Sequence, residues 1–189
     1  TSTVSGGTVQ VDGARLAPAG LTGWSPTAQV PVVMEFVATF NAAQYQNAGL
    51  GAGDNSISAN GMYATGDQPW AMFGTAGTTN TLYARLNPGG DVAIPNSANY
   101  IGSSHRYRIE WRAGNVVEFF IDGVSVDSRT ATFGSITMRP GISDYQLGGP
   151  SLAVDWVWLT PYVSPCEFTS RIFDVDESVD WLELTWGGT

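Results

Sequence analysis

HRYRIEWRAGNVVEFFIDGVSVDSR, residues 105–129, is the stretch that decides the fold. In its first eight residues the odd positions are His, Tyr, Ile and Trp, whereas the even positions are Arg, Arg, Glu and Arg. This alternation predicts a half-buried strand. Val117, Phe119 and Ile121 continue the apolar face on a second strand, and Asp122-Gly123 supplies a two-residue turn into a third. The stretch therefore predicts an antiparallel sheet.

The Asp-Gly turn also predicts a register. If it pairs Ile121 with Val124, then Phe119 lies opposite Val126 on the buried face. Matching the apolar faces of the first two strands leaves residues 113–115 as a three-residue loop.

A row of carboxylates follows from the same register. Glu118 would lie opposite Asp127, and pairing Trp111 with Val117 sets Glu110 across from Glu118. Arginines at positions 108, 112 and 129 fall on the diagonals and would offset the repulsion between like charges. A cation site or an acid/base pair is one interpretation. We favour a solvated face with ion pairs, because such faces are common and mostly inert.

The rest of the chain repeats short apolar runs between turns. The 23 glycines and 10 prolines are scattered between Val, Ile, Phe, Tyr and Trp runs, a pattern typical of a β-sandwich, and no helical run is convincing. Further strands are predicted over residues 7–12, 32–40, 44–51, 69–74, 81–86, 135–139, 144–147 and 152–160. We predict one all-β domain, an antiparallel sandwich of two sheets, over residues 1–163.

The net charge and the length of the apolar runs limit the classes of partner that the protein is expected to bind. The net charge is −9 and all eight basic residues are arginine, so nucleic acid and anionic membrane are both disfavoured. The longest apolar stretches are only as long as strands, so no membrane span is predicted. The chain begins in polar residues, so any export signal is expected to be absent from this sequence.

Three runs carry a family resemblance: YRIEW at 107–111, VEFFIDGV at 117–124 and LAVDWVWLTPY at 152–162. They resemble the concanavalin A-like lectin/glucanase superfamily and are most similar to laminarinase-type glycoside hydrolases and the non-catalytic jelly rolls related to them. The match covers roughly residues 32–162. It implies a jelly roll of two stacked antiparallel sheets with a ligand, often a polysaccharide, on the concave face, and often a structural calcium. The motifs are specific for fold and nearly silent on activity.

The catalytic signature of that family is missing. Laminarinase-type enzymes carry Glu-x-Asp-x-x-Glu or Glu-x-Asp-x-Glu on a concave strand, but no Glu here is followed by Asp two positions later. Glu110 and Glu118 fall on strands that the resemblance assigns to the convex side. A jelly-roll lyase would need a Tyr/His base, yet His105 lies on the apolar face of its strand and is interpreted as a core or strand-end histidine. Catalysis is therefore the less favoured function.

Sugar binding calls for a different set of side chains. A pyranose offers an apolar C–H face and a ring of hydroxyls, so its sites combine an aromatic ring with planar polar groups. The strands at residues 44–51, 69–74 and 81–86, with a later strand, can supply them. The predicted ligand-binding residues are Gln46, Trp70, Tyr83, Arg85, Asp144 and Gln146. The alternative is that the rings are ordinary sheet aromatics and Arg85 is their ion-pair neighbour.

The favoured function is thus a non-catalytic, lectin-like carbohydrate-binding module of a secreted or cell-surface multidomain bacterial protein. Its expected partners are a polysaccharide or oligosaccharide and the other domains of the parent chain. The alternatives are a glycan-active enzyme, either a glycoside hydrolase or a polysaccharide lyase with an atypical site, and a structural spacer that binds nothing.

Residues 164–189 are predicted to form a short linker and a β-hairpin, which either closes the sandwich or starts a following module. The turn of this hairpin carries Asp174, Asp176 and Asp180, which could bind a structural calcium, although it lacks the Gly and terminal Glu of an EF-hand loop. A solvated acidic turn is favoured. The single Cys166 excludes an internal disulfide and is too few for a structural zinc site.

Overall fold

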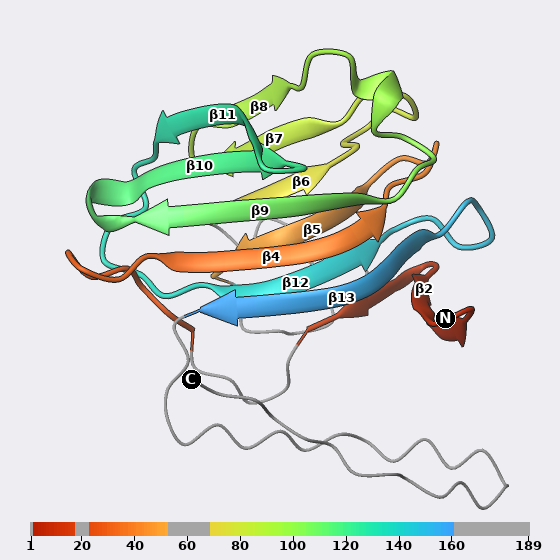
Figure 1. Cartoon of the computed structure of the whole chain (residues 1–189), viewed down its shortest axis with the longest axis horizontal. Coiled ribbons are helices and arrows are strands. Elements are labelled where there is room, and N and C mark those ends of the chain that lie inside the picture. Colours follow the sequence, from red (N-terminus) through yellow and green to blue (C-terminus); the bar gives the residue numbers. More distant parts are fainter. Residues whose placement is uncertain (1, 18–22, 53–68, 161–189) are drawn as a thin grey trace, which may run out of the picture.

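The computed structural model describes residues 2–17, 23–52 and 69–160, and they form two antiparallel sheets stacked face to face (Figure 1). One sheet has the order β1 (Thr3–Ser5), β2 (Thr8–Val11), β13 (Leu152–Thr160), β4 (Val32–Thr39), β9 (His105–Arg112), β10 (Val116–Ile121) and β11 (Val124–Thr130). The other has the order β3 (Ala14–Leu16), β12 (Arg139–Asp144), β5 (Gln46–Gly51), β6 (Trp70–Gly74), β7 (Tyr83–Asn87) and β8 (Gly90–Ala93). The predicted all-β sandwich is confirmed.

The register of β9 and β10 is as predicted. Val117 pairs with Trp111 and Glu118 pairs with Glu110, while residues 113–115 form a short 3-10 turn between the strands. Ile121 pairs with Val124 across the Asp-Gly turn, also as predicted.

Beyond that turn the predicted register is wrong by one residue. Phe120 pairs with Ser125 but Phe119 pairs with Asp127, so Val126 is the extra residue of a β-bulge. Glu118 therefore lies opposite Ser128. A bulge is not visible in the alternation of a single strand, because it changes only the count of residues between two pairs.

The row of carboxylates is shorter than expected for the same reason. Arg112 lies between Glu110 and Glu118, with its Nε 3.0 Å from one carboxylate and its Nη1 2.9 Å from the other. Asp127 instead forms an ion pair with Arg129, whose Nε lies 2.6 Å from Asp127 Oδ2. The face is laced with ion pairs, and the two facing carboxylates share the guanidinium of Arg112.

The core lies between the sheets and is rich in rings. Phe36 of β4 and Tyr107 of β9 stack with ring centroids 5.3 Å apart. From the opposite sheet, Phe73 of β6 packs against Tyr107 at 5.0 Å and edge-on against Phe119 of β10 at 5.3 Å. All four side chains are fully buried. Phe73 thus fixes the six-stranded sheet against the seven-stranded one.

Several strands differ from the sequence prediction. Two strands were expected at residues 135–139 and 144–147, but the structure has one, β12, between them. β12 contains Pro140, which cannot donate to a neighbouring strand. It is tolerated because β3 pairs only with Ile142, Ser143 and Asp144, so that at Pro140 the strand has no β3 neighbour. The short strands β1, β3 and β8 were also missed, and each has only three or four residues.

The predicted tail, with Cys166, Asp174, Asp176 and Asp180, lies outside the described residues. Within the described residues, no three His, Cys, Asp or Glu side chains gather in a way that could hold a metal ion. The same part of the chain contains no helix long and apolar enough to cross a membrane.

Candidate functional site

The outer face of the six-stranded sheet carries three of the six predicted ligand-binding residues. Along β7, Ala84 and Leu86 belong to the core while Tyr83 and Arg85 alternate with them on the outer face. Trp70 of β6 alternates with core residues in the same way, and it pairs with Gly51 and Asn87 on the neighbouring strands. Alternation along β6 and β7 thus puts these three side chains on the face that points away from the core.

Gln46 and Asp144 lie elsewhere. They pair with each other across β5 and β12, and both side chains are buried on the face of the sheet that points to the core. The Gln46 amide donates to Asp144 Oδ2 at 2.9 Å and to the Pro150 carbonyl at 2.6 Å, while its Oε1 accepts from the Asn41 N–H at 2.7 Å. Burial raises the pKa of Asp144, although hydrogen bonds from Gln46 and from two backbone N–H groups oppose the rise. These side chains hold loops to the sheet, and their role in ligand binding stays a prediction.

Arg85 organises the polar part of the outer face. Its Nη1 donates to Asn47 Oδ1 at 2.8 Å, and its Nε lies 3.1 Å from Asp91 Oδ1 in an ion pair that is not aligned for a hydrogen bond. The Asn47 amide in turn donates to the Tyr45 carbonyl at 3.0 Å. The network links β7 to the start of β5 and fixes the Asn47 amide group.

Glycines alternate with larger side chains on this face, where Trp70 and Met72 of β6 lie opposite Gly51 and Gly49. Gly49, Gly51 and Gly141 lie on its register, and Gly74 pairs with Asn47. A Cβ on Gly74 would stand 2.3 Å from Asn47 Oδ1 and would displace it. The close approach of Asn47 therefore requires glycine at position 74.

Trp70 is only 8% exposed, so its ring does not offer an open surface on which a sugar could stack. Exposed rings occur instead at the end of the sheet, immediately before β5 and immediately after β12. Tyr45 and Tyr145 are 44% and 49% exposed, and their rings meet edge to face with centroids 5.8 Å apart. We call these two residues the tyrosine pair.

The backbone of the tyrosine pair is strained at Tyr45. Tyr45 has a φ of 59°, which is unusual for a bulky residue and costs on the order of 1 kcal/mol. Its N–H bonds to the Ala76 carbonyl, which holds it in place. Strain of this kind persists only where the surroundings fix it and is concentrated at functional sites.

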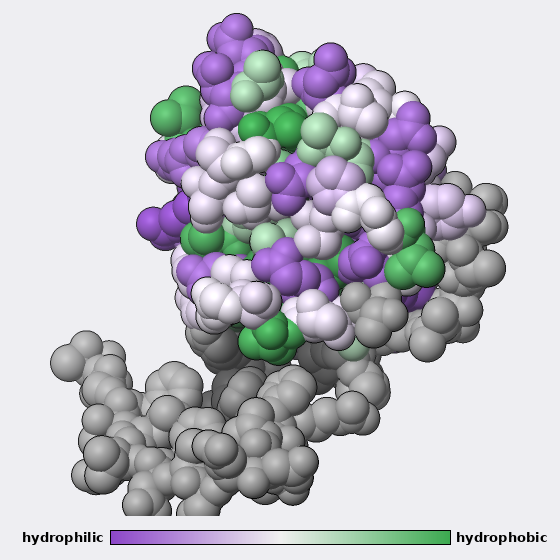
Figure 2. Space-filling model, turned by 90° about the vertical axis from the view of Figure 1, so that its right-hand side faces the viewer, coloured by the Kyte–Doolittle hydropathy of each residue, from purple (hydrophilic) through white to green (hydrophobic). Residues whose placement is uncertain are grey.

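Amide groups flank the tyrosine pair. Gln146 accepts a hydrogen bond from the Gln44 N–H at 3.3 Å, and the Gln44 side-chain amide donates to the Gly77 carbonyl at 2.7 Å. Gln146 thus lies exposed beside the pair, whereas its neighbours Gln46 and Asp144 are buried. Figure 2 views the end of the sandwich at which β12 ends and β5 begins, where hydrophobic side chains are scattered among polar ones rather than gathered in a patch.

No protein-family model matches this sequence, and no curated protein matches it. Solved structures do. The carbohydrate recognition domain of Emp46p superposes with a TM-score of 0.58 at 13% identity over 84% of each chain. The endo-1,3-beta-glucanase from Streptomyces sioyaensis gives 0.50 at 15% identity, over 82% of this chain and 75% of that chain. The alginate lyase from Corynebacterium sp. gives 0.51 at 11% identity, over 84% and 80%.

The chain has a concanavalin A-like jelly-roll fold. At these identities the likeness shows the fold alone, and the resemblance inferred from the three runs is confirmed to that extent. The enzymes and the recognition domain have the same fold, so the function of this chain must be inferred from its own side chains.

His105, the one histidine, sits at the same end of the jelly roll as the tyrosine pair. Its Nδ1 lies 2.7 Å from Asp122 Oδ2 and its Nε2 lies 2.8 Å from Ser103 Oγ. The alignment has the order of a nucleophile, a base and a carboxylate. However, the Asn99 carbonyl lies 3.1 Å from the same Nε2, so this nitrogen faces a backbone oxygen as well as the serine hydroxyl. We assign His105 a structural role, as the strand-end histidine of the sequence prediction.

The hydrogen bonds that Asp122 makes with His105 and Arg106 should make the stability of the fold depend on pH. Burial alone would raise the pKa of Asp122, but hydrogen bonds from the Arg106 N–H and from His105 outweigh it and hold the pKa below its ordinary range. A carboxyl whose pKa is lower in the folded chain stabilises the fold above its unfolded pKa, and this contribution is lost as pH falls through the folded pKa. We expect Asp122→Asn to be less stable than the unsubstituted protein at neutral pH, with a gap that closes in acid.

Urea unfolding from about pH 6 to about pH 2 measures that gap. Asp155→Asn, which removes one exposed carboxylate from β13, is the control and should leave a small, flat difference. A constant gap between Asp122→Asn and the unsubstituted protein at every pH would show that the Asp122 charge does not contribute.

Proposed function

We propose that this chain is a non-catalytic carbohydrate-binding module, and that the tyrosine pair is the platform on which the sugar rests. The observation that carries the proposal is the exposure of two touching rings at one end of the six-stranded sheet, beside the amides of Gln44 and Gln146. The apolar face of a pyranose stacks on such rings while its hydroxyls bond to planar amides. The Arg85–Asn47 network and Tyr83 border the platform along the sheet.

A neutral polysaccharide is the ligand favoured by charge. The chain carries a net charge of −9, so an acidic glycan such as alginate would be repelled at low salt. One of the structural neighbours is an endo-1,3-beta-glucanase, an enzyme named for a neutral glycan. A β-1,3-glucan is therefore the first ligand to test.

The test is retention by insoluble β-1,3-glucan, agarose and calcium alginate, followed by titration with a soluble oligosaccharide. We expect Tyr45→Ala and Tyr145→Ala each to weaken binding about tenfold, because each removes a stacking surface worth roughly 1 kcal/mol or slightly more. The double variant should lose retention. Trp70→Ala and Gln46→Ala, tested separately, decide whether the other predicted residues take part.

Trp156→Ala is the matched control. Trp156 is a 40% exposed ring on β13, in the other sheet, so its removal should not change retention if binding uses the tyrosine pair. Equal retention of the double tyrosine variant and the unsubstituted protein would overturn the platform. Release of reducing sugars or unsaturated ends from the bound glycan would overturn the non-catalytic part and favour the hydrolase or lyase.

Secretion or cell-surface location, and attachment to other domains of a parent chain, belong to the same proposal. They are supported by the target, since polysaccharides of this kind lie outside the cell.

A further inference from the structure

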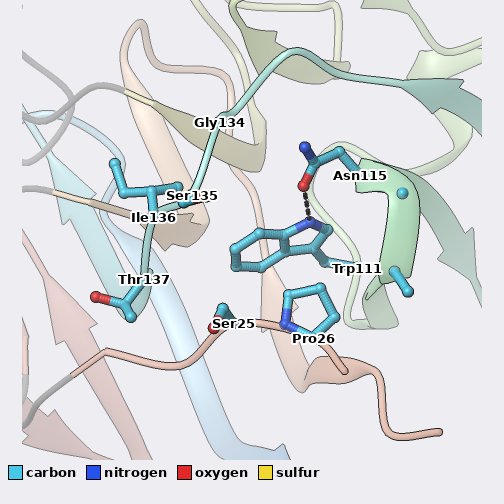
Figure 3. A pocket seen from close by; sticks show the side chains of 10 residues that line it. Ser25, Pro26, Trp111, Asn115, Gly134, Ser135, Ile136 and Thr137 are labelled. Carbon is cyan, nitrogen blue, oxygen red and sulfur yellow. Dashed lines mark hydrogen bonds between the residues drawn. The ribbon is translucent and has the colours of Figure 1, made fainter. Parts of the chain in front are cut away.

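A cavity of about 670 Å³ opens at the other end of the jelly roll (Figure 3). Its walls are the turn between β9 and β10, the segment at residues 134–137 and the segment around Pro26. The tyrosine pair stands near the start of β9 and the cavity near its end, and an eight-residue strand spans about 23 Å. The two places are therefore separate sites.

The floor of the cavity is rigid. Trp111 is 1% exposed, packs edge to face against Phe133 at 5.6 Å, and donates its indole N–H to Asn115 Oδ1 at 3.1 Å. This bond, drawn in Figure 3, sets the orientation of the Asn115 amide. Because Oδ1 is taken by the indole, the Nδ2 group is left to donate to something else.

The walls offer hydroxyl and apolar groups in turn. Ser25, Ser135 and Thr137 carry hydroxyls that make no hydrogen bond within the described part of the chain. The pyrrolidine ring of Pro26 lies next to Ser25 and the Trp111 ring, and Ile136 lies between Ser135 and Thr137, as Figure 3 shows. Among the described residues, no charged side chain lines the cavity.

We propose that this cavity binds one neutral sugar residue, as a monosaccharide or as the end of a glycan. A volume of this size is typical of small-molecule sites. Hydroxyls that can both donate and accept, an amide donor and small apolar surfaces match the hydroxyl ring and the C–H face of a pyranose. The missing charge and the net charge of the chain both disfavour an acidic sugar. The inference does not rest on the tyrosine pair.

The experiment titrates the ¹⁵N-labelled protein with D-glucose, D-galactose and D-mannose, and with D-glucuronate as the acidic contrast. We expect at least one neutral sugar to shift the indole N–H signal of Trp111 in a saturable way and glucuronate to leave it unchanged. Ser135→Phe, which fills the mouth with a ring, should abolish the shift. Thr137→Val, which removes one hydroxyl at constant shape, should weaken binding about fivefold.

Ser128→Phe places the same ring on an exposed position of β11 and should change nothing, which separates blocking of the cavity from a general effect of the ring. The double variant of the tyrosine pair should bind the monosaccharide as before, so failure here and failure of the proposed platform are distinguishable. Binding of none of the three neutral sugars, or a shift that survives Ser135→Phe in a folded protein, would overturn the inference.

Discussion

Replacing Phe73 with alanine is expected to lower the free energy of unfolding by about 3–5 kcal/mol. The ring is fully buried and is the side chain of the six-stranded sheet that meets Phe36, Tyr107 and Phe119 of the other sheet. Its loss removes apolar contact and leaves a cavity that the surrounding rings cannot fill without leaving their own contacts. Because a domain is stable by only about 5–15 kcal/mol, this change consumes much of the total.

Denaturation in urea measures the effect as a lower midpoint at an unchanged slope. Val124→Ala, at a position that is 66% exposed, is the control and should lie within about 0.5 kcal/mol of the unsubstituted protein. A loss below about 1 kcal/mol for Phe73→Ala would contradict the packing between the sheets.

Gly49→Ala should destabilise the fold by about 3 kcal/mol. A Cβ at this position would stand 2.3 Å from the Ala71 carbonyl oxygen and 2.5 Å from Met72 Cα. Both atoms belong to the backbone of β6, so the clash can be relieved only by moving one strand away from its neighbour. The ladder between β5 and β6, on which Trp70 and Asn47 are placed, would move with it.

Gly149→Ala is the matched control, because nothing lies within 4 Å of the position its Cβ would take. It should change the midpoint of unfolding very little. If Gly49→Ala were as stable as Gly149→Ala, the spacing of β5 and β6 would have to differ from the one described.

Strands in which apolar and polar residues alternate were predictable, because the alternation itself shows which side chains are buried. β9, β10 and β13 begin and end within one residue of the predicted bounds. The sequence could not show the bulge at Val126, which depends on the partner strand, or β12, whose Pro140 and Gly141 argue locally against a strand. Tertiary pairing outweighed the local preference there.

The residues of the candidate site also divide into those that could be predicted from the sequence and those that could not. Alternation placed Tyr83 and Arg85 on the outer face, but Gln46 and Asp144 were chosen by residue type although Gln46 alternates with the core residue Ala48. The tyrosine pair was missed because its members lie 100 positions apart and neither belongs to a strand. Within residues 44–51, strict alternation puts Tyr45 and Asn47 on the face opposite Gln46, and this is the one local signal for the pair.

The most direct test is to titrate the protein with a hexasaccharide of β-1,3-linked glucose and to record the ring resonances of its tyrosines and tryptophans together with the products in solution. We expect saturable shifts at Tyr45 and Tyr145, unchanged signals for Trp156 and Trp158, and an intact hexasaccharide afterwards. Shifts confined to the seven-stranded sheet, or a hexasaccharide cut into shorter products, would contradict it.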